Sequence, residues 1–268
     1  MDEILKLENL SLTYQSDNGE TQALKNLTFS LYSGEFVSII GPSGCGKTTI
    51  LSVISGLIKP TSGKITFKNN NGESPLKSVG YMLQRDELFP WRTIEKNIFL
   101  PLEIKKINTQ ENRNYALKLL EKYGLKDFIK AYPSEISGGM RQRVALIRTL
   151  VSKPDILLLD EPFSALDYQT RLNVCDDVYN IIKEQKKSVI LVTHDISEAL
   201  SMSDRIIVLT KRPAEILQIH TCNFNKSLSP LKRREEKDFG KMFEILWGQL
   251  NNEKRWKFVL WKVIIFKK

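Results

Sequence analysis

The chain has 268 residues, of which 41% are hydrophobic, enough to fill the core of one large domain or two small ones. Its net charge is +9, but lysines alternate with acidic residues, so charge alone favours a well-solvated surface over a nucleic-acid or membrane-binding one. Three cysteines without a Cys-x-x-Cys pair argue against a disulfide framework, and two histidines argue against a His-rich zinc site.

No targeting or membrane-spanning segment is evident in the sequence. The start, Met1 to Lys6, contains an acidic pair and no long apolar core, so we expect no signal peptide. No stretch approaches the ~20 apolar residues that a spanning helix needs. We therefore expect a cytoplasmic protein that reaches a membrane only through a partner.

Short strands separated by turns are predicted for the first part of the chain. The turn signals are Ser16–Gly19, Ser33-Gly34, Pro60–Gly63 and Asn69–Gly72. The strands are expected at Ile4–Leu10, Leu24–Leu31, Glu35–Ile40, Lys64–Phe67 and Val79–Leu83.

A glycine-rich loop follows one of these strands and opens a helix-forming run, Thr48–Ile54. Its glycines let backbone amides close around phosphate oxygens, and the helix adds its positive N-terminal end. Lys47 is placed to reach the β- and γ-phosphates, and Thr48 to hold Mg²⁺ through its hydroxyl. The loop reads Gly41-Pro42-Ser43-Gly44-Cys45-Gly46-Lys47-Thr48 and is followed by Thr49.

Helices are predicted from about Glu87 to Leu150. Tyr115, Leu119 and Tyr123 recur at helical spacing, with Gly124 as a C-terminal stop. Another helix follows Ser137-Gly138-Gly139, whose free amide groups could bind an anion. Ser-Gly-Gly taken alone is equally compatible with a plain helix cap.

The second half alternates apolar strands with helices. The strands Ile156–Leu159, Val189–Val192 and Ile206–Leu209 are continuous apolar runs, typical of a parallel sheet buried on both faces. Helices Tyr168–Gln185 and Ile196–Met202 lie between them, which predicts an α/β fold.

Two carboxylates follow the first of these strands. Asp160 and Glu161 would lie at the edge of the sheet where ligands bind. Asp160 suits Mg²⁺, and Glu161 suits a general base that activates water. An acidic turn is the alternative, but the phosphate loop favours the catalytic interpretation.

The run Ser137-Gly138-Gly139-Met140-Arg141-Gln142-Arg143 resembles the signature motif of ATP-binding-cassette (ABC) ATPases. The resemblance covers residues 1–220 and implies a RecA-like P-loop NTPase core of the α/β class. It also implies an antiparallel β subdomain and an α-helical subdomain inserted at about 87–152. Residues 221–268 would form a C-terminal helical extension.

Other family motifs are present in the family's order. Tyr14 resembles the adenine-stacking aromatic, although it could be a plain surface tyrosine. Gln84 resembles the glutamine that contacts Mg²⁺ and the catalytic water. Ser164-Ala165-Leu166-Asp167 resembles the D-loop. His194 resembles the switch histidine that contacts the γ-phosphate.

The switch histidine has a supporting local pattern. Asp195 and Glu198 are spaced for a capping box at the start of the next helix. His220 has no such context and receives no predicted role.

The resemblance implies how the motifs work together. ATP and Mg²⁺ would be the cofactors, and two domains would pair head to tail. ATP would be held by Gly41–Thr49 of one copy, and by Ser137, Gly138, Gly139 and Asp167 of the other. A homodimer is the simplest arrangement, because the chain carries one set of motifs.

The segment from Gln84 to Ile94 gives the best indication of what the ATPase drives. Its Leu-Phe-Pro-Trp-Arg-Thr string resembles ABC importers for nitrate, sulfonates, taurine and pyrimidine precursors. Phe89 and Trp91 would anchor a helix of a membrane permease, unless they pack inside the helical subdomain. A substrate-binding protein would act through the permease, and the chain would lie peripherally on the inner face of the membrane.

Two other classes share the catalytic motifs. One is the detached ATPase of an ABC exporter, and the other is a soluble ABC ATPase acting on nucleic acid or ribosomes. The second would carry tandem cassettes or a long coiled coil, which this chain lacks, so we expect no nucleic-acid partner.

The C-terminal end departs from the family pattern. Residues 255–268 are basic, aromatic and apolar, which favours either a membrane-surface contact or a segment packed on its own domain. Leu231–Gln249 is predicted to be largely helical.

Overall fold

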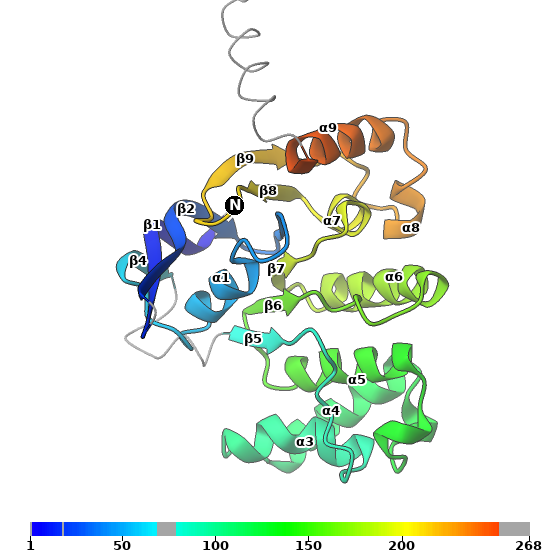
Figure 1. Cartoon of the computed structure of the whole chain (residues 1–268). Coiled ribbons are helices and arrows are strands. Elements are labelled where there is room, and N and C mark those ends of the chain that lie inside the picture. Colours follow the sequence, from blue (N-terminus) through cyan, green and yellow to red (C-terminus); the bar gives the residue numbers. More distant parts are fainter. Residues whose placement is uncertain (1, 18, 69–78, 252–268) are drawn as a thin grey trace, which may run out of the picture.

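Two β-sheets with helices packed around them form the fold of the computed structural model, which describes residues 2–17, 19–68 and 79–251 (Figure 1). The smaller sheet is antiparallel and three-stranded, in the order β2-β1-β4. Its strands are β1 (Glu3–Ser16), β2 (Gly19–Tyr32) and β4 (Ser62–Phe67).

The larger sheet has six strands in the order β5-β6-β7-β3-β8-β9, and all its pairs are parallel except β8 with β9. Strands β3, β6 and β7 are buried at every residue, which explains their continuously apolar sequences. The strands are β3 (Phe36–Ile40), β5 (Val79–Met82), β6 (Ile156–Asp160), β7 (Ser188–Val192), β8 (Arg205–Leu209) and β9 (Ile216–Thr221).

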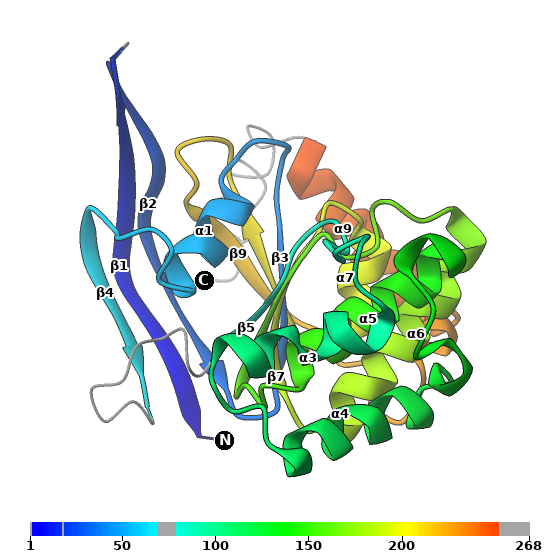
Figure 2. The ribbon, with the colours of Figure 1, turned by 90° about the horizontal axis from the view of Figure 1, so that it is seen from below.

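Three helices, α3, α4 and α5, connect β5 to β6 and lie with α6 on one side of the larger sheet (Figure 2). Gly124 ends α4 in the left-handed region at φ 73°, as predicted for a C-terminal stop. The helices are α1 (Lys47–Ile54), α3 (Ile94–Ile104), α4 (Gln110–Lys122), α5 (Gly138–Leu150), α6 (Tyr168–Glu184), α7 (Ile196–Met202), α8 (Pro230–Arg233) and α9 (Phe239–Asn251), with short 3-10 turns at Lys126–Phe128 and Pro133–Glu135.

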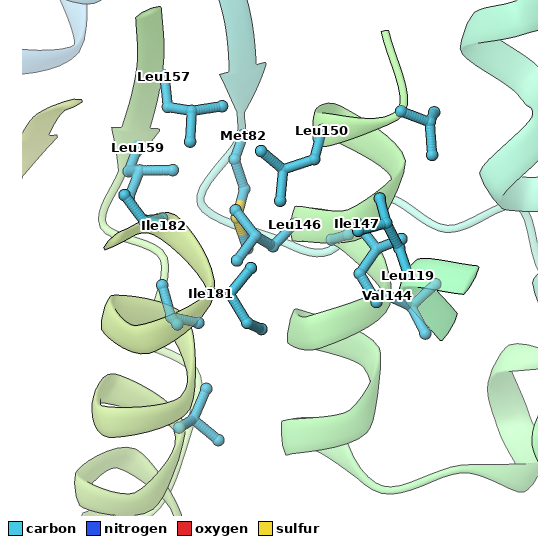
Figure 3. Packing of buried hydrophobic residues seen from close by; sticks show 14 of the residues in the cluster. Met82, Leu119, Val144, Leu146, Ile147, Leu150, Leu157, Leu159, Ile181 and Ile182 are labelled. Carbon is cyan, nitrogen blue, oxygen red and sulfur yellow. The ribbon is translucent and has the colours of Figure 1, made fainter. Parts of the chain in front are cut away.

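The helices between β5 and β6 share a hydrophobic core with the sheet. Leu146 and Leu150 of α5 pack near Met82, Leu157 and Leu159 of the strands (Figure 3). The other face of the sheet is covered by α1 and the antiparallel sheet, whose buried leucines form a second core. Both faces of the larger sheet are therefore covered by packed elements, which hold the ends of its strands in place.

The first two strands are longer than predicted, so the predicted limits Ile4–Leu10 and Leu24–Leu31 are wrong. The β1–β2 ladder continues out to the pair Ser16 and Gly19. Side chains near this end are exposed, so hydrogen bonds rather than apolar burial hold it. The apolar sequence pattern stops where the side chains stop being buried, whereas the hydrogen bonds between the two strands continue beyond that point.

Two other limits also differ. Strand β4 begins at Ser62, inside the turn predicted at Pro60–Gly63, because Ser62 already pairs with Ser11. The helix predicted over Leu231–Gln249 is two helices, α8 and α9. The turn predicted at Asn69–Gly72 and the basic tail 255–268 lie outside the described residues. Within the described ranges, every helix is too short or too polar to cross a bilayer.

Candidate active site

The glycine-rich loop joins β3 to α1 and turns its lysine back onto its own backbone. Gly44 and Gly46 adopt φ values of 70° and 124°, which side chains other than glycine rarely reach. The buried Lys47 donates to the carbonyl oxygens of Gly41 at 2.9 Å and Pro42 at 3.1 Å. The cationic group is thus held over the loop by two backbone carbonyl oxygens.

Asp160 at the end of β6 lies against the first residues of α1. Thr48 Oγ1 donates to Asp160 Oδ1 at 3.1 Å, and Tyr81 donates its hydroxyl to Oδ2 at 3.3 Å. Burial raises the pKa of this carboxyl, because it disfavours the charged form more than the hydrogen bonds from Thr48 and Tyr81 favour it. Tyr81 was not predicted, since nothing in its sequence context marks a strand tyrosine as a partner of Asp160.

These oxygen groups fit the expected Mg²⁺. A hard cation would relieve the desolvation of the Asp160 carboxylate, and Mg²⁺ typically takes only one or two protein carboxylates alongside phosphate oxygens. No cluster of three or more His, Cys, Asp or Glu that could hold a metal occurs among the described residues. The donor set therefore suits a metal shared with a phosphate group better than an all-protein cage.

Glu161 is the meeting point of two other predicted residues. Gln84 Nε2 donates to Glu161 Oε2 at 3.3 Å, and His194 Nδ1 lies 3.1 Å from the same oxygen. The three side chains come from loops that follow β5, β6 and β7, which are neighbours in the sheet. Sheet topology therefore brings together residues that are far apart in sequence.

The backbone of Glu161 is strained. Its φ is 45°, in the left-handed region that a glutamate rarely adopts. The amide of Glu161 donates to Val192 at 2.8 Å, and the Ser164 hydroxyl donates to the Glu161 carbonyl at 3.0 Å. Strain of this kind, typically ~1–3 kcal/mol, is frequent where a side chain must be aimed at a substrate.

Tyr14 lies beside the start of the phosphate-loop helix. Its hydroxyl oxygen is 3.3 Å from Thr49 Oγ1, and the side chain is 41% exposed. The ring is thus available for stacking on a base, and its predicted role in adenine binding stays a prediction.

The signature residues lie elsewhere in the chain. Ser137 caps α5, with its side chain accepting from the Met140 amide at 3.3 Å. A Cβ on Gly139 would come within 2.9 Å of Val174, so α5 and α6 can approach only with glycine there. The buried residues of α5, which begins at Gly138, and those of α1, which begins at Lys47, belong to two different hydrophobic cores. Figure 2 shows the two helices on opposite sides of the larger sheet.

Comparisons with known proteins identify the family of the chain. A family model described as ABC transporter matches residues 24–164. The chain belongs to the ABC transporter family. It is thus an ATP-binding and ATP-hydrolysing transporter subunit, and the predicted fold class is confirmed.

Three relatives illustrate the similarity. The chain is 45% identical over 249 residues to the ABC transporter ATP-binding protein YtlC of Bacillus subtilis, covering 92% of this chain and 96% of YtlC. It is 40% identical to the aliphatic sulfonates import ATP-binding protein SsuB of Bacillus thuringiensis, covering 80% and 84% of the two chains. The dimeric structure of MJ0796, a bacterial ABC transporter cassette, superposes with a TM-score of 0.70 at 35% identity, covering 82% of this chain and 99% of that one.

The loop between β7 and α7, residues 193–195, contains His194 and is called the switch loop below. In this ABC ATPase its hydrogen bonds differ from those of the predicted capping box. Asp195 does cap α7, accepting from the amides of Ser197 at 2.7 Å and Glu198 at 3.1 Å. Glu198 does not reach back to the cap; its carboxylate accepts from the Thr193 hydroxyl at 2.6 Å. The second predicted hydrogen bond of the box, from the Asp195 amide to the Glu198 side chain, is therefore wrong. The buried Glu198 carboxylate lies instead against Thr193 at the end of β7.

Arg171 connects the D-loop to this switch loop and was not predicted. Its Nη2 donates to the Leu166 carbonyl at 3.0 Å, and its Nη1 lies 3.5 Å from Asp195 Oδ2. Its Nε lies 3.8 Å from Glu198 Oε1. Asp167 itself caps α6 by accepting from the Thr170 amide at 3.1 Å. An arginine inside a helix carries no sequence signal for such a bridge.

The buried Glu198 carboxyl is expected to make the free energy of unfolding depend on pH. Burial raises its pKa from 4.5 to about 7, so the folded protein keeps a proton that the unfolded chain releases between these values. Its contribution to the free energy of unfolding therefore falls as pH rises through that window. Replacing Glu198 by Gln should remove this fall, shifting the stability difference in the variant's favour by about 1–3 kcal/mol between pH 5 and pH 8.

Urea denaturation of the parent and Glu198→Gln at the two pH values measures this shift. Glu20→Gln, in the exposed β1–β2 hairpin, is the control. An unchanged stability difference between Glu198→Gln and the parent would show that Glu198 stays ionised across the whole range.

The segment after Gln84 presents an aromatic pair at the surface. Trp91 is 72% exposed, and its ring stacks on that of Phe89 with centroids 5.0 Å and planes 14° apart. The alternative in which both rings pack inside the helical subdomain is wrong for Trp91. The fully buried Asn97, which was not predicted, accepts from the Phe89 amide at 2.7 Å and donates to the Phe89 carbonyl at 3.1 Å.

The same segment is tied to the signature helix. Arg141 Nε lies 3.0 Å from Asp86 Oδ2, and Arg148 donates to the carbonyl oxygens of Asp86 at 2.6 Å and Glu87 at 2.7 Å. The segment that carries Trp91 is therefore linked at one end to Gln84 and at its side to α5.

Proposed function

We propose that this chain powers the uptake of a small solute through a separate membrane permease, with an aliphatic sulfonate as the favoured solute class. The observation that carries the proposal is the stacking of the exposed Trp91 on the half-buried Phe89, whose backbone is held by Asn97 on the segment that leads from Gln84. The 40% identity to a sulfonate import ATP-binding protein supports the solute class. Nitrate, taurine and pyrimidine precursors are the other candidates.

Different residues of the chain bind the nucleotide and take part in its hydrolysis. Lys47 and the loop amides, from Gly41 to Thr49, bind the phosphates, and Tyr14 stacks on the base. Thr48, Asp160 and Gln84 would hold Mg²⁺, which when bound would neutralise phosphate charge. Glu161 takes a proton from the attacking water, and His194 donates a hydrogen bond to the γ-phosphate.

A second copy completes the site. Ser137, Gly138, Gly139 and Asp167 of one chain face the nucleotide on the phosphate loop of the other, so that hydrolysis requires the closed pair. The placement of α5 and α1 on opposite sides of the larger sheet, which keeps both motifs of one chain away from a single nucleotide, supports this pairing. The pair would lie on the inner face of the membrane, contact the permease through residues 84–94, and meet a substrate-binding protein only through the permease.

The test is affinity purification of tagged Glu161→Gln protein from detergent-solubilised membranes with MgATP, followed by mass spectrometry. A co-purifying permease and substrate-binding protein are expected, and the binding protein can then be titrated with sulfonates, taurine, nitrate and pyrimidines. Ribosomal or DNA-bound partners without any membrane protein would contradict the transport assignment. A permease without a binding protein would favour the exporter class.

Trp91→Ala is expected to uncouple transport from ATP hydrolysis. Removing the exposed ring takes away an anchor for the permease while the phosphate loop stays intact, so solute transported per ATP should fall about tenfold or more. The measurement is solute uptake and phosphate release in proteoliposomes. Leu57→Ala, at a 64% exposed apolar residue after α1, is the matched control. Equal transport per ATP in Trp91→Ala and the parent would refute the anchor.

A further inference from the structure

The C-terminal helix α9 places an exposed tryptophan close to the phosphate loop. Phe243 and Trp247 are one helical turn apart, and their rings stack with centroids 6.1 Å and planes 12° apart. Phe243 packs on the core that α9 shares with α7, whereas Trp247 is 57% exposed. A ring this exposed leaves apolar surface in water that an intermolecular contact would remove.

A pocket of about 540 Å³ connects this helix to the candidate active site. One wall comes from Trp247 and Leu250 of α9, and the other includes Pro42 and Ser43 of the phosphate loop and the switch residue His194. The tryptophan therefore borders the same hollow as two elements that bind nucleotide in the proposed mechanism. In Figure 1, α9 lies next to α7, which begins just after the switch loop.

Helix α9 is held firmly, so Trp247 is presented in a defined position. Gln249 donates from Nε2 to Gln218 Oε1 at 2.7 Å, and its own Oε1 lies 2.9 Å from His220 Nε2. Leu246 is fully buried beneath the helix. A side chain on an anchored helix loses little conformational freedom on docking, which favours its use as a contact residue.

We propose that Trp247, supported by Phe243, docks on the second copy of this chain when the ATP-bound pair closes. The argument is continuity, because Pro42, Ser43 and His194 belong to the face that the second copy covers in the proposed pair, and Trp247 of α9 lines the same pocket as these three residues. In a two-fold pair the contact is made twice. The inference rests on the head-to-tail pairing proposed above, and α9 then strengthens that pairing without touching the nucleotide.

The first test measures dimerisation of full-length protein by analytical ultracentrifugation in the Glu161→Gln background with MgATP. Adding Trp247→Glu should weaken dimerisation about tenfold or more while the affinity of the monomer for ATP stays unchanged. Ile104→Glu is the matched control, since Ile104 is 71% exposed on α3, at the opposite end of the molecule from α9 (Figure 1).

The outcomes separate this inference from the proposed function. Normal dimerisation of the Trp247→Glu protein would overturn the α9 contact and leave the proposed function standing. If the Glu161→Gln parent itself fails to dimerise with MgATP, the pairing and the α9 contact both fail.

A second measurement does not depend on how the glutamate variant folds. A benzophenone amino acid placed at position 247 of the full chain should give an MgATP-dependent cross-link between two copies, identified by mass spectrometry. A cross-link confined to one chain, for example to residues 252–268, would overturn the inference, as would the absence of any cross-link.

Discussion

Replacing Glu161 by Gln is expected to lower ATP turnover by about 100-fold or more while ATP binding is retained. The carboxylate is the group placed to accept a proton from water, and the loss of a general base typically costs about 10²–10⁴-fold. The amide has nearly the same shape, so the neighbouring Gln84 and His194, which lie 3.3 and 3.1 Å from Glu161, should keep their places.

The same variant is expected to accumulate as an ATP-bound dimer. If closure of the pair precedes hydrolysis, blocking hydrolysis leaves the closed state populated. Phosphate release gives the turnover, and ultracentrifugation with MgATP gives the dimer fraction. Glu184→Gln on the exposed end of α6 is the control and should behave as the parent. Parent-like turnover in Glu161→Gln would remove Glu161 from the role of base.

Lys47→Ala is expected to reduce ATP affinity by about 100-fold or more. Each charge-assisted hydrogen bond is worth about 1.5–3 kcal/mol, and Lys47 is placed to make more than one to the phosphates. Its present partners are the carbonyl oxygens of Gly41 and Pro42, which solvent can satisfy in the variant. The affinity loss should therefore exceed any loss of folding stability.

Titration calorimetry with MgATP measures this loss, and thermal unfolding checks that the variant is folded. Lys59→Ala, an exposed lysine beyond the end of α1, is the control. A folded Lys47→Ala protein that binds ATP as tightly as the parent would show that the loop amides alone hold the phosphates.

The two variants separate binding from chemistry. Lys47→Ala should lose the ATP-dependent dimer because nucleotide no longer binds. Glu161→Gln should gain dimer because nucleotide binds and is not cleaved. Opposite effects on one measured quantity are hard to explain by general misfolding, which would lower the dimer fraction in both.

The fold class and the positions around which the candidate site is built could be predicted from the sequence. Gln84, Glu161 and His194 each follow a short apolar run, and such runs predict parallel strands. The carboxyl ends of parallel strands meet at one edge of a sheet, which is why the fold brings the three side chains close together. Their catalytic roles stay predictions.

The partners that hold these residues in place follow from tertiary packing and could not be predicted. Tyr81 on Asp160, Arg171 between the D-loop and the switch loop, and Asn97 beneath Phe89 are contacts between separate elements. The hydrogen bond from Thr193 to Glu198 and the extension of the β1–β2 ladder to Ser16 and Gly19 were also not predicted. The physical reason is that hydrophobic period and turn chemistry are local properties of a chain, whereas these hydrogen bonds depend on which elements packing brings together. The place of Trp247 beside the phosphate loop is likewise a product of packing, since α9 begins at Phe239, far from that loop in the sequence.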